Sequence, residues 1–325
     1  NASGEIIAAS LDISGNVDID GVLETDNLTV GSDQGDDGQV LTSTGSGVAW
    51  EDAAGGVTFK EVGTNFANSL MVGDDSTGTL SSASGNTAVG IDIFAALTSG
   101  TNNTAVGFSG LKANTTGAKN TAVGASALDA NTTAANGTAV GHNALGANTT
   151  GADNTAIGKN SLLVNTTGAN NVAVGSAALD ANTTAADNVA VGKSALTANT
   201  SGISNTAVGT TAMEANTTGA ENTAIGFQAL NANTTASNNT AVGRLALLLN
   251  TTGAENVAVG AASLDANTTG ANNVGIGTAA LGSNTTASNN TAVGHVALNS
   301  NTTGASNTAV GKSAMAAQTT GNNNV

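Results

Sequence analysis

The two histidines are the side chains with the chemistry most often used in acid–base catalysis and metal binding. His142 and His295 occupy the same place in a 17-residue repeat, nine repeats apart. If successive repeats stack as β-strands, about 43 Å separates the two imidazoles. A catalytic pair or a metal site needs direct contact, so we interpret both histidines as outward-pointing turn residues.

Clustered carboxylates are the second candidate for chemistry. Asp18 and Asp20, followed by Asp33, Asp36 and Asp37, supply the oxygen ligands that Ca²⁺ prefers. They lack the spacing of a twelve-residue calcium loop. We therefore favour solvated turns, and calcium binding by these clusters stays open.

Other chemical motifs are absent from the sequence. There is no cysteine, hence no disulfide and no thiolate site. No phosphate loop, nucleophile elbow or zinc motif stands in the strand-to-helix context that it requires. The many Asn-Thr-Thr triplets match glycosylation acceptors, but a repeated turn explains them better. We expect no metal, no cofactor and no enzymatic activity.

Composition limits what the chain can build. Among 325 residues there are 43 Gly, no Pro, no Tyr, one Trp and five Phe, which excludes a thick core of large side chains. The net charge of −16 argues against a nucleic-acid partner, because phosphate binding requires clustered Lys and Arg. No run approaches the roughly 18 apolar residues of a membrane span, so membrane insertion is not expected.

The dominant feature is an internal repeat. Asn-Thr-Ala-Val-Gly and close variants recur with a constant 17-residue period. We number the positions of the repeat 1–17 from this first Asn. Asn324 and Val325 open a further unit, from which we expect a longer natural chain. The fourteen units begin at 86, 103, 120, 137, 154, 171, 188, 205, 222, 239, 256, 273, 290 and 307.

Two positions of the repeat are apolar throughout. Position 4 is Val or Ile and position 9 is Leu, Met or Phe, and we predict that both fill the interior of each turn of chain, here called a coil. They are five positions apart, so the chain must reverse between them, and the invariant Gly at position 5 can supply the reversal. Position 6 then points outward. The predicted core residues are Val89, Phe94, Val106, Leu111, Val123, Leu128, Val140, Leu145, Ile157, Leu162, Val174, Leu179, Val191, Leu196, Val208, Met213, Ile225, Leu230, Val242, Leu247, Val259, Leu264, Ile276, Leu281, Val293, Leu298, Val310 and Met315.

The repeat predicts two short strands and two turns in each coil. Thr-Ala-Val and Val-Ala-Val favour a strand, and Asn-Thr-Thr-Gly favours a turn. Helical repeats are disfavoured, because Gly, Thr and Asn are frequent and no 3.6-residue periodicity persists. Parallel stacking at about 4.8 Å gives fourteen coils a length of roughly 67 Å. No two successive coils carry a charge at position 17, as stacking requires. We predict an all-β fold, a parallel β-solenoid or β-roll of 17-residue coils.

A single coil is too thin to be stable alone. Two buried apolar side chains do not offset the entropy lost when a whole coil is ordered, although neighbouring coils recover part of the difference. The Ala-rich positions 3, 8 and 11 offer a surface on which subunits can approach closely. We therefore expect an oligomer.

The unit Asn-Thr-Ala-Val-Gly-x-x-Ala-Leu-x-Ala-Asn-Thr-Thr-Gly-Ala-x resembles repeats in tail-fibre-like proteins of marine phages. It is similar, more distantly, to the shorter Val-Ala-Ile-Gly repeats in the β-roll heads of trimeric autotransporter adhesins. The resemblance covers residues 86–325 and is most specific at the Val or Ile, the following Gly and the later Leu, as in Val123, Gly124 and Leu128. It implies a homotrimeric fibre on a virion or outside the cell, with a role in surface attachment.

The segment 1–85 differs from the array. Fourteen acids stand there against Lys60 alone, and short apolar runs within 11–30 are broken by turn residues, which predicts brief strands. Residues 39–42 and 48–50 flank a Gly-rich turn and predict a hairpin. We expect an acidic β-rich connector or collar region over 1–67, a degenerate capping coil over 68–85 and the repeat array over 86–325.

Two functions suit such a fibre. The first is a structural segment, either a phage tail fibre or the shaft or head of an adhesin, that provides length and attaches to a glycan or receptor of a host cell. Phe108 and Phe227, exposed at position 6, are the contact candidates, since aromatic side chains anchor many interfaces. The alternative is an ice-binding β-solenoid that uses the stacked Thr of Asn-Thr-Thr.

Overall fold

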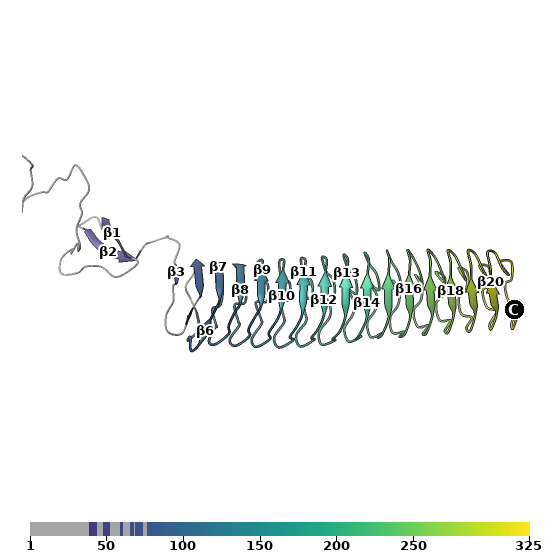
Figure 1. Ribbon diagram of the computed structural model, residues 1–325, viewed down its shortest axis with the longest axis horizontal. Helices are drawn as coiled ribbons and strands as arrows, with labels where there is room; N and C mark the ends of the chain where they lie inside the picture. Colours follow the sequence, from purple (N-terminus) through teal and green to yellow (C-terminus); the bar gives the residue numbers. More distant parts are fainter. Residues whose placement is uncertain (1–38, 44–47, 53–58, 61–65, 68, 74–76) are drawn as a thin grey trace, which may run out of the picture. The chain divides into compact units, whose positions relative to one another are not determined.

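Figure 1 shows the computed structural model of the chain. It describes residues 39–43, 48–52, 59–60, 66–67, 69–73 and 77–325, and it divides into two compact units, Asn1–Val57 and Thr58–Val325. The strands predicted within 11–30 and the aspartate clusters between 18 and 37 lie outside the described residues.

The first unit contains an antiparallel hairpin. Strand β1 (Gln39–Ser43) pairs with β2 (Val48–Asp52), and Leu41 lies opposite Trp50. Apolar β-forming residues on both sides of a Gly-containing turn pair in this way. The predicted hairpin is confirmed.

The second unit is a stack of coils, each of which adds one strand to a parallel sheet (Figure 1). Every strand of the array pairs in register with the equivalent strand of the next coil, so Thr138 lies beside Thr155 and Val140 beside Ile157. The described residues contain strands and turns but no helix. The prediction of an all-β parallel β-solenoid is confirmed. The strands of the repeats are β7 (Thr87–Ile91), β8 (Thr104–Phe108), β9 (Thr121–Val123), β10 (Thr138–Val140), β11 (Thr155–Ile157), β12 (Val172–Val174), β13 (Val189–Val191), β14 (Thr206–Val208), β15 (Thr223–Ile225), β16 (Thr240–Val242), β17 (Val257–Val259), β18 (Val274–Ile276), β19 (Thr291–Val293) and β20 (Thr308–Val310).

The stack begins with a modified coil. Strand β5 (Leu70–Gly73) pairs in parallel with β7 at the 17-residue spacing, as a degenerate coil would. Strand β4 (Phe66–Ala67) pairs with β6 (Ala83–Ser84) at the same spacing. Strand β3 (Phe59–Lys60) runs antiparallel to β5 and occupies the end of the sheet. A covering strand of this kind protects an edge from pairing with other chains.

The prediction of two strands per coil is wrong, because each repeat from residue 86 onward contains one strand. Positions 7 and 9 have positive φ angles, for example 54° at Ser126 and 52° at Leu128. A strand cannot continue through such residues, which lie in the left-handed region. Hydrogen bonds between coils persist there nevertheless: the Leu128 N–H donates to the Ala144 carbonyl at 3.1 Å, and the Ala130 N–H to the Gly146 carbonyl at 3.2 Å.

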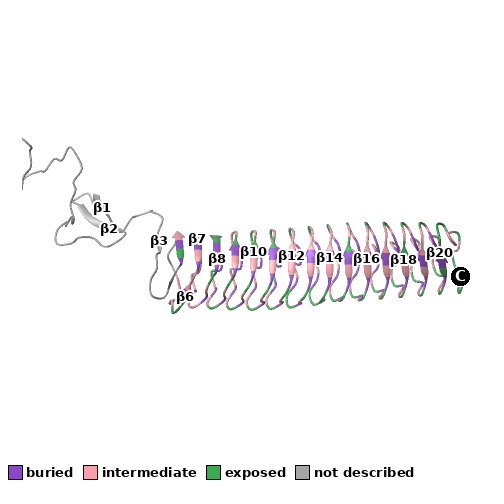
Figure 2. Cartoon of the chain, in the orientation of Figure 1, coloured by how far each residue is buried: buried purple, intermediate pink, exposed green. Residues whose placement is uncertain are grey.

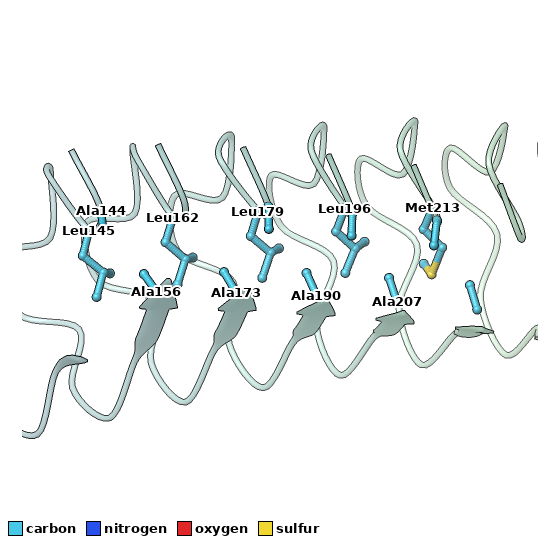
Figure 3. Close-up of a cluster of buried hydrophobic side chains, with 14 of the residues drawn as sticks. Ala144, Leu145, Ala156, Leu162, Ala173, Leu179, Ala190, Leu196, Ala207 and Met213 are labelled. Atoms are coloured by element: carbon cyan, nitrogen blue, oxygen red, sulfur yellow. The ribbon is translucent and has the colours of Figure 1, made fainter. Parts of the chain in front are cut away.

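The interior of most coils is filled by Ala at positions 3 and 8 and by the large side chain at position 9. Figure 3 shows this stack, in which Ala156 and Leu162 are fully buried. The prediction for position 9 is confirmed, and only Met315, in the last coil, is partly rather than fully buried. The fully buried residues are Phe94, Leu111, Leu128, Leu145, Leu162, Leu179, Leu196, Met213, Leu230, Leu247, Leu264, Leu281 and Leu298.

The prediction that position 4 fills the coil is wrong. Side chains alternate along a strand, so burial of position 3 turns position 4 outward, and Ile157 and Ile225 are 40% and 41% exposed. The reason is the narrow interior. A Cβ on Gly110, at position 8, would lie 3.6 Å from the Ala105 Cβ and 3.9 Å from the Ala122 Cβ, so the space between positions 3 and 8 suits methyl groups. A branched side chain is buried at position 8 only as Ile93, and the next coil there has Gly110 at that position. The outward residues are Val89, Val106, Val123, Val140, Ile157, Val174, Val191, Val208, Ile225, Val242, Val259, Ile276, Val293 and Val310.

Two rows of asparagine are also buried inside the coils. At position 12, the Asn182 amide donates to Asn165 Oδ1 at 2.9 Å and to the Ala185 carbonyl at 3.0 Å. At position 1, Asn171 Oδ1 accepts the backbone N–H of Asn188 at 3.0 Å. Such bonds recur from coil to coil and supply the partners that buried polar groups require. The interpretation of Asn-Thr-Thr as a turn alone missed these interior ladders.

The glycine at position 5 does adopt a backbone conformation closed to other residues, and in most repeats the strand ends just before it. The predicted reversal that turns both positions 4 and 9 inward is wrong, because position 4 faces outward. Gly192 has φ 137°, and a Cβ on it would lie 2.5 Å from the carbonyl oxygen of Gly209 in the next coil. Both the backbone conformation and the close stacking therefore require glycine. The same burial pattern repeats along the stack in Figure 2.

Candidate interaction surface

One side of the solenoid carries the strands, and the side chains of positions 2 and 4 form two rows on its outer surface. Position 2 is Thr or Val, and position 4 is Val or Ile. Between residues 86 and 310 neither position carries a charged side chain. We call these two rows the strand face.

The strand face is long and narrow. Its length of roughly 67 Å and the roughly 10 Å span of a three-residue strand give an area of about 700 Å². Monomeric proteins rarely expose contiguous apolar patches of more than a few hundred Å². A stable protein interface buries about 800 Å² on each partner. The face therefore approaches the size of an interface, and its position 4 row is apolar throughout.

Positions 17 and 6 lie at the two ends of the strand face. In the coil of β11, Asp153 stands two residues before the strand and Lys159 two residues after it, and both are exposed. Position 17 has a positive φ, 58° at Asp153, where the chain turns into the strand. We did not predict that these ends differ in charge, although the identities of the residues at positions 6 and 17 are visible in the sequence.

The aromatic candidates point outward as predicted. Phe108 is 55% exposed and Phe227 is 47% exposed. They lie seven coils apart, about 34 Å, so they cannot form one pocket within a chain. His142 and His295 are exposed at the same position of their coils, and no single site joins them.

The Asn-Thr-Thr segments form a different edge of the coil. At position 13, Thr132 Oγ1 donates to the Thr149 carbonyl of the next coil at 3.1 Å. At position 14 the side chain is exposed, as at Thr133 and Thr150. One row of exposed hydroxyls therefore runs along this edge. Because the Asn of each triplet is buried, as at Asn148, the triplets are not accessible glycosylation acceptors in the folded chain.

Three aspartates at position 10 have a raised pKa. Partial burial raises the pKa of each carboxyl above its usual range, and backbone hydrogen bonds oppose the shift. They lie in separate coils, so they do not form a carboxylate pair for acid–base catalysis. These residues are Asp129, Asp180 and Asp265.

Within the described ranges, no cluster of three or more His, Asp or Glu side chains is placed to hold a metal ion. The same residues include no helix with the length and hydropathy needed to cross a bilayer. No protein-family model, curated protein or solved structure matches this chain. The strand face and its two ends are therefore the features from which a function is inferred.

Proposed function

We propose that the chain is a segment of a homotrimeric structural fibre, in which the strand faces of three chains meet around a common axis. The observation that carries this proposal is the outward-facing row of Val and Ile at position 4, exposed or half-buried, which an isolated chain would leave in contact with water. Ala at positions 3 and 8, which we expected to form the subunit contact, lies inside the coil. The resemblance of the repeat to those of trimeric fibres supports the same assembly.

The stacked architecture suits an extended, stiff role. Each coil contacts only its neighbours, so length grows with the number of repeats without a new core. The fibre would hold a recognition element away from the surface that bears it, on a virion or outside the cell. Phe108 and Phe227, three copies each in a trimer, are the candidates for contact with a glycan or receptor of a host cell, because weak sites repeated on one fibre bind with avidity.

Light scattering after size-exclusion chromatography tests the assembly. We expect a mass three times the 30.9 kDa of one chain. A variant with Ile157→Lys, Val191→Lys and Ile225→Lys places charges on the strand face and should give a monomer that keeps its far-UV circular dichroism. The control is Thr167→Lys, Ser201→Lys and Thr235→Lys, at exposed position 14 of the same coils, which should stay trimeric. A wild type with the mass of a single chain at micromolar concentration would refute the trimer.

Binding to host cells or to arrayed surface glycans tests attachment. The wild-type chain is compared with a Phe108→Ser, Phe227→Ser variant, and weaker binding by the variant is expected. Equal binding by both would reject the two aromatics as contacts, and no binding by either would assign the array a spacer role.

Ice binding is a second candidate, favoured by the regular row of exposed hydroxyls at position 14. The position 13 hydroxyl is already a donor to the next coil, so this edge offers one exposed row rather than two. Thermal hysteresis of the wild-type chain, lost in the Thr167→Lys, Ser201→Lys, Thr235→Lys variant, would establish this function in place of the fibre role.

A further inference from the structure

The charged side chains at the two ends of the strand face are segregated by sign. At position 6, beyond the C-terminal end of each strand, there are bases and histidines but no acids. At position 17, before the N-terminal end, the charged residues are acids, with the exception of Lys119. The bases at position 6 are Lys159, Lys193, Arg244 and Lys312. The acids at position 17 are Asp153, Asp187, Glu221 and Glu255.

Two strands carry one charge of each sign. Strand β11 lies between Asp153 and Lys159, and β13 lies between Asp187 and Lys193. All four side chains are exposed. The three-residue strand keeps the acid and the base of one chain at opposite ends of the face, so the two cannot pair with each other.

The acids are held in position without being neutralised. Asp153 Oδ1 accepts the side-chain amide of Asn136 at 3.0 Å, and an Asn of the preceding coil holds Asp187 in the same way. In the described part of the chain one ion pair forms, between Lys112 and Asp92, and it involves neither end of the strand face. Among the described residues, the charges at the ends of the strand face therefore have no oppositely charged partner in an ion pair.

We propose that Lys159 of one chain pairs with Asp153 of the next, and Lys193 with Asp187, and that these pairs fix the chains in parallel orientation. The proposal rests on the homotrimer proposed above. Cyclic symmetry about the fibre axis places the same coil of every chain at the same height and brings the C-terminal strand ends of one chain to the N-terminal strand ends of its neighbour. An antiparallel arrangement would place base against base and acid against acid, which is repulsive.

Two bases of position 6 remain, Arg244 and Lys312. Lys312 has only uncharged residues at position 17 of its own and the adjacent coils, whereas the register of Arg244 agrees with this arrangement. Arg244, in the coil of β16, has no acid at the other end of its own strand. Glu221 and Glu255 stand at the ends of the strands on either side, about 4.8 Å away along the axis. That offset is within the reach of an Arg side chain, so Arg244 can pair with an acid of the neighbouring chain without any shift of the stack.

Charge reversal tests the pairing. In low salt, the double variant Lys159→Glu, Lys193→Glu should assemble more weakly than the wild type. The protein concentration at which half of the chains are dissociated should rise about tenfold, because each lost pair occurs three times around the axis. The difference should shrink in high salt. Adding Asp153→Lys and Asp187→Lys to the same chain restores opposite charges and should restore assembly. The control is Lys312→Glu, on the same row but with an uncharged residue at the other end of its strand, and it should change nothing.

Cross-linking reads the orientation directly, since the chain has no cysteine of its own. Val106→Cys, in the second coil, should form same-site cross-links with a short bis-maleimide if the chains are parallel. An antiparallel assembly would cross-link only a mixture of Val106→Cys and Val293→Cys chains. That result would overturn the pairing and leave the trimer standing. The same conclusion would follow if the charge-reversal variants assembled as tightly as the wild type. A wild type that is monomeric at every concentration would overturn both.

Discussion

Two substitutions in one coil, Leu230→Ala and Ile225→Ala, compare a side chain inside the coil with one on the strand face. Leu230 is fully buried, whereas Ile225 is 41% exposed. Each change to Ala removes three carbons, worth about 2.4 kcal/mol when wholly buried. At Leu230 the cavity left between Met213 and Leu247 adds to this, so Leu230→Ala should cost about 3 to 4 kcal/mol. At Ile225 the loss is partial and opens to solvent, so Ile225→Ala should cost about 1 kcal/mol in a single chain.

Urea unfolding followed by circular dichroism at several protein concentrations measures both costs. The Leu230→Ala cost should be the same at every concentration. The Ile225→Ala cost should be small where the chain is monomeric and larger where it is assembled, because three copies of the side chain meet at the proposed axis. An Ile225→Ala variant that loses as much stability as Leu230→Ala in the monomeric chain would refute the placement of position 4 outside the coil.

Three further predictions concern the coil itself. Gly192→Ala should disrupt stacking, because its Cβ would meet a backbone oxygen at 2.5 Å, whereas Gly110→Ala, with contacts of 3.6 Å or more, should raise the melting temperature slightly. Gly275→Ala should be destabilising by about 1 to 3 kcal/mol, because its Cβ would lie 2.7 Å from Ser263 Oγ, and adding Ser263→Ala should recover most of the loss in a double-mutant cycle. The three aspartates of raised pKa bind protons more tightly in the folded chain than in the unfolded chain, so the free energy of unfolding should fall as the pH rises above their usual value of 3.8. Their replacement by Asn should therefore raise the calorimetric melting temperature at pH 7 but not at pH 3, and a larger gain at pH 3 would contradict this sign. The three positions are Asp129, Asp180 and Asp265.

Stacking and its period could be predicted from the repeat. A unit of constant length with no insertions allows equivalent residues to pair with one another, and Thr138 does lie beside Thr155. The turn at position 5 was predictable because glycine recurs there without exception. The burial of Leu162 was predictable because a large apolar side chain recurs at position 9 of every repeat.

The choice between positions 3 and 4 was not predictable from hydrophobicity. Val and Ile are more apolar than Ala, so position 4 was the expected core residue. The strand allows only one of the two to face inward. The distance between the walls decides which, because the spacing around Gly110 suits Ala at positions 3 and 8.

The repeat alone was enough to predict a parallel stack of 17-residue coils with glycine at the turn, a large apolar side chain inside and variable residues outside. The folded chain was needed to show that Ala faces inward, that Val and Ile form an exposed row, and that asparagine is buried. These outcomes depend on contacts between coils, which no single repeat contains. Asn182 can be buried because Asn165, in the preceding coil, accepts its hydrogen bond, and Ile157 is exposed because the interior is too narrow to hold a branched side chain there.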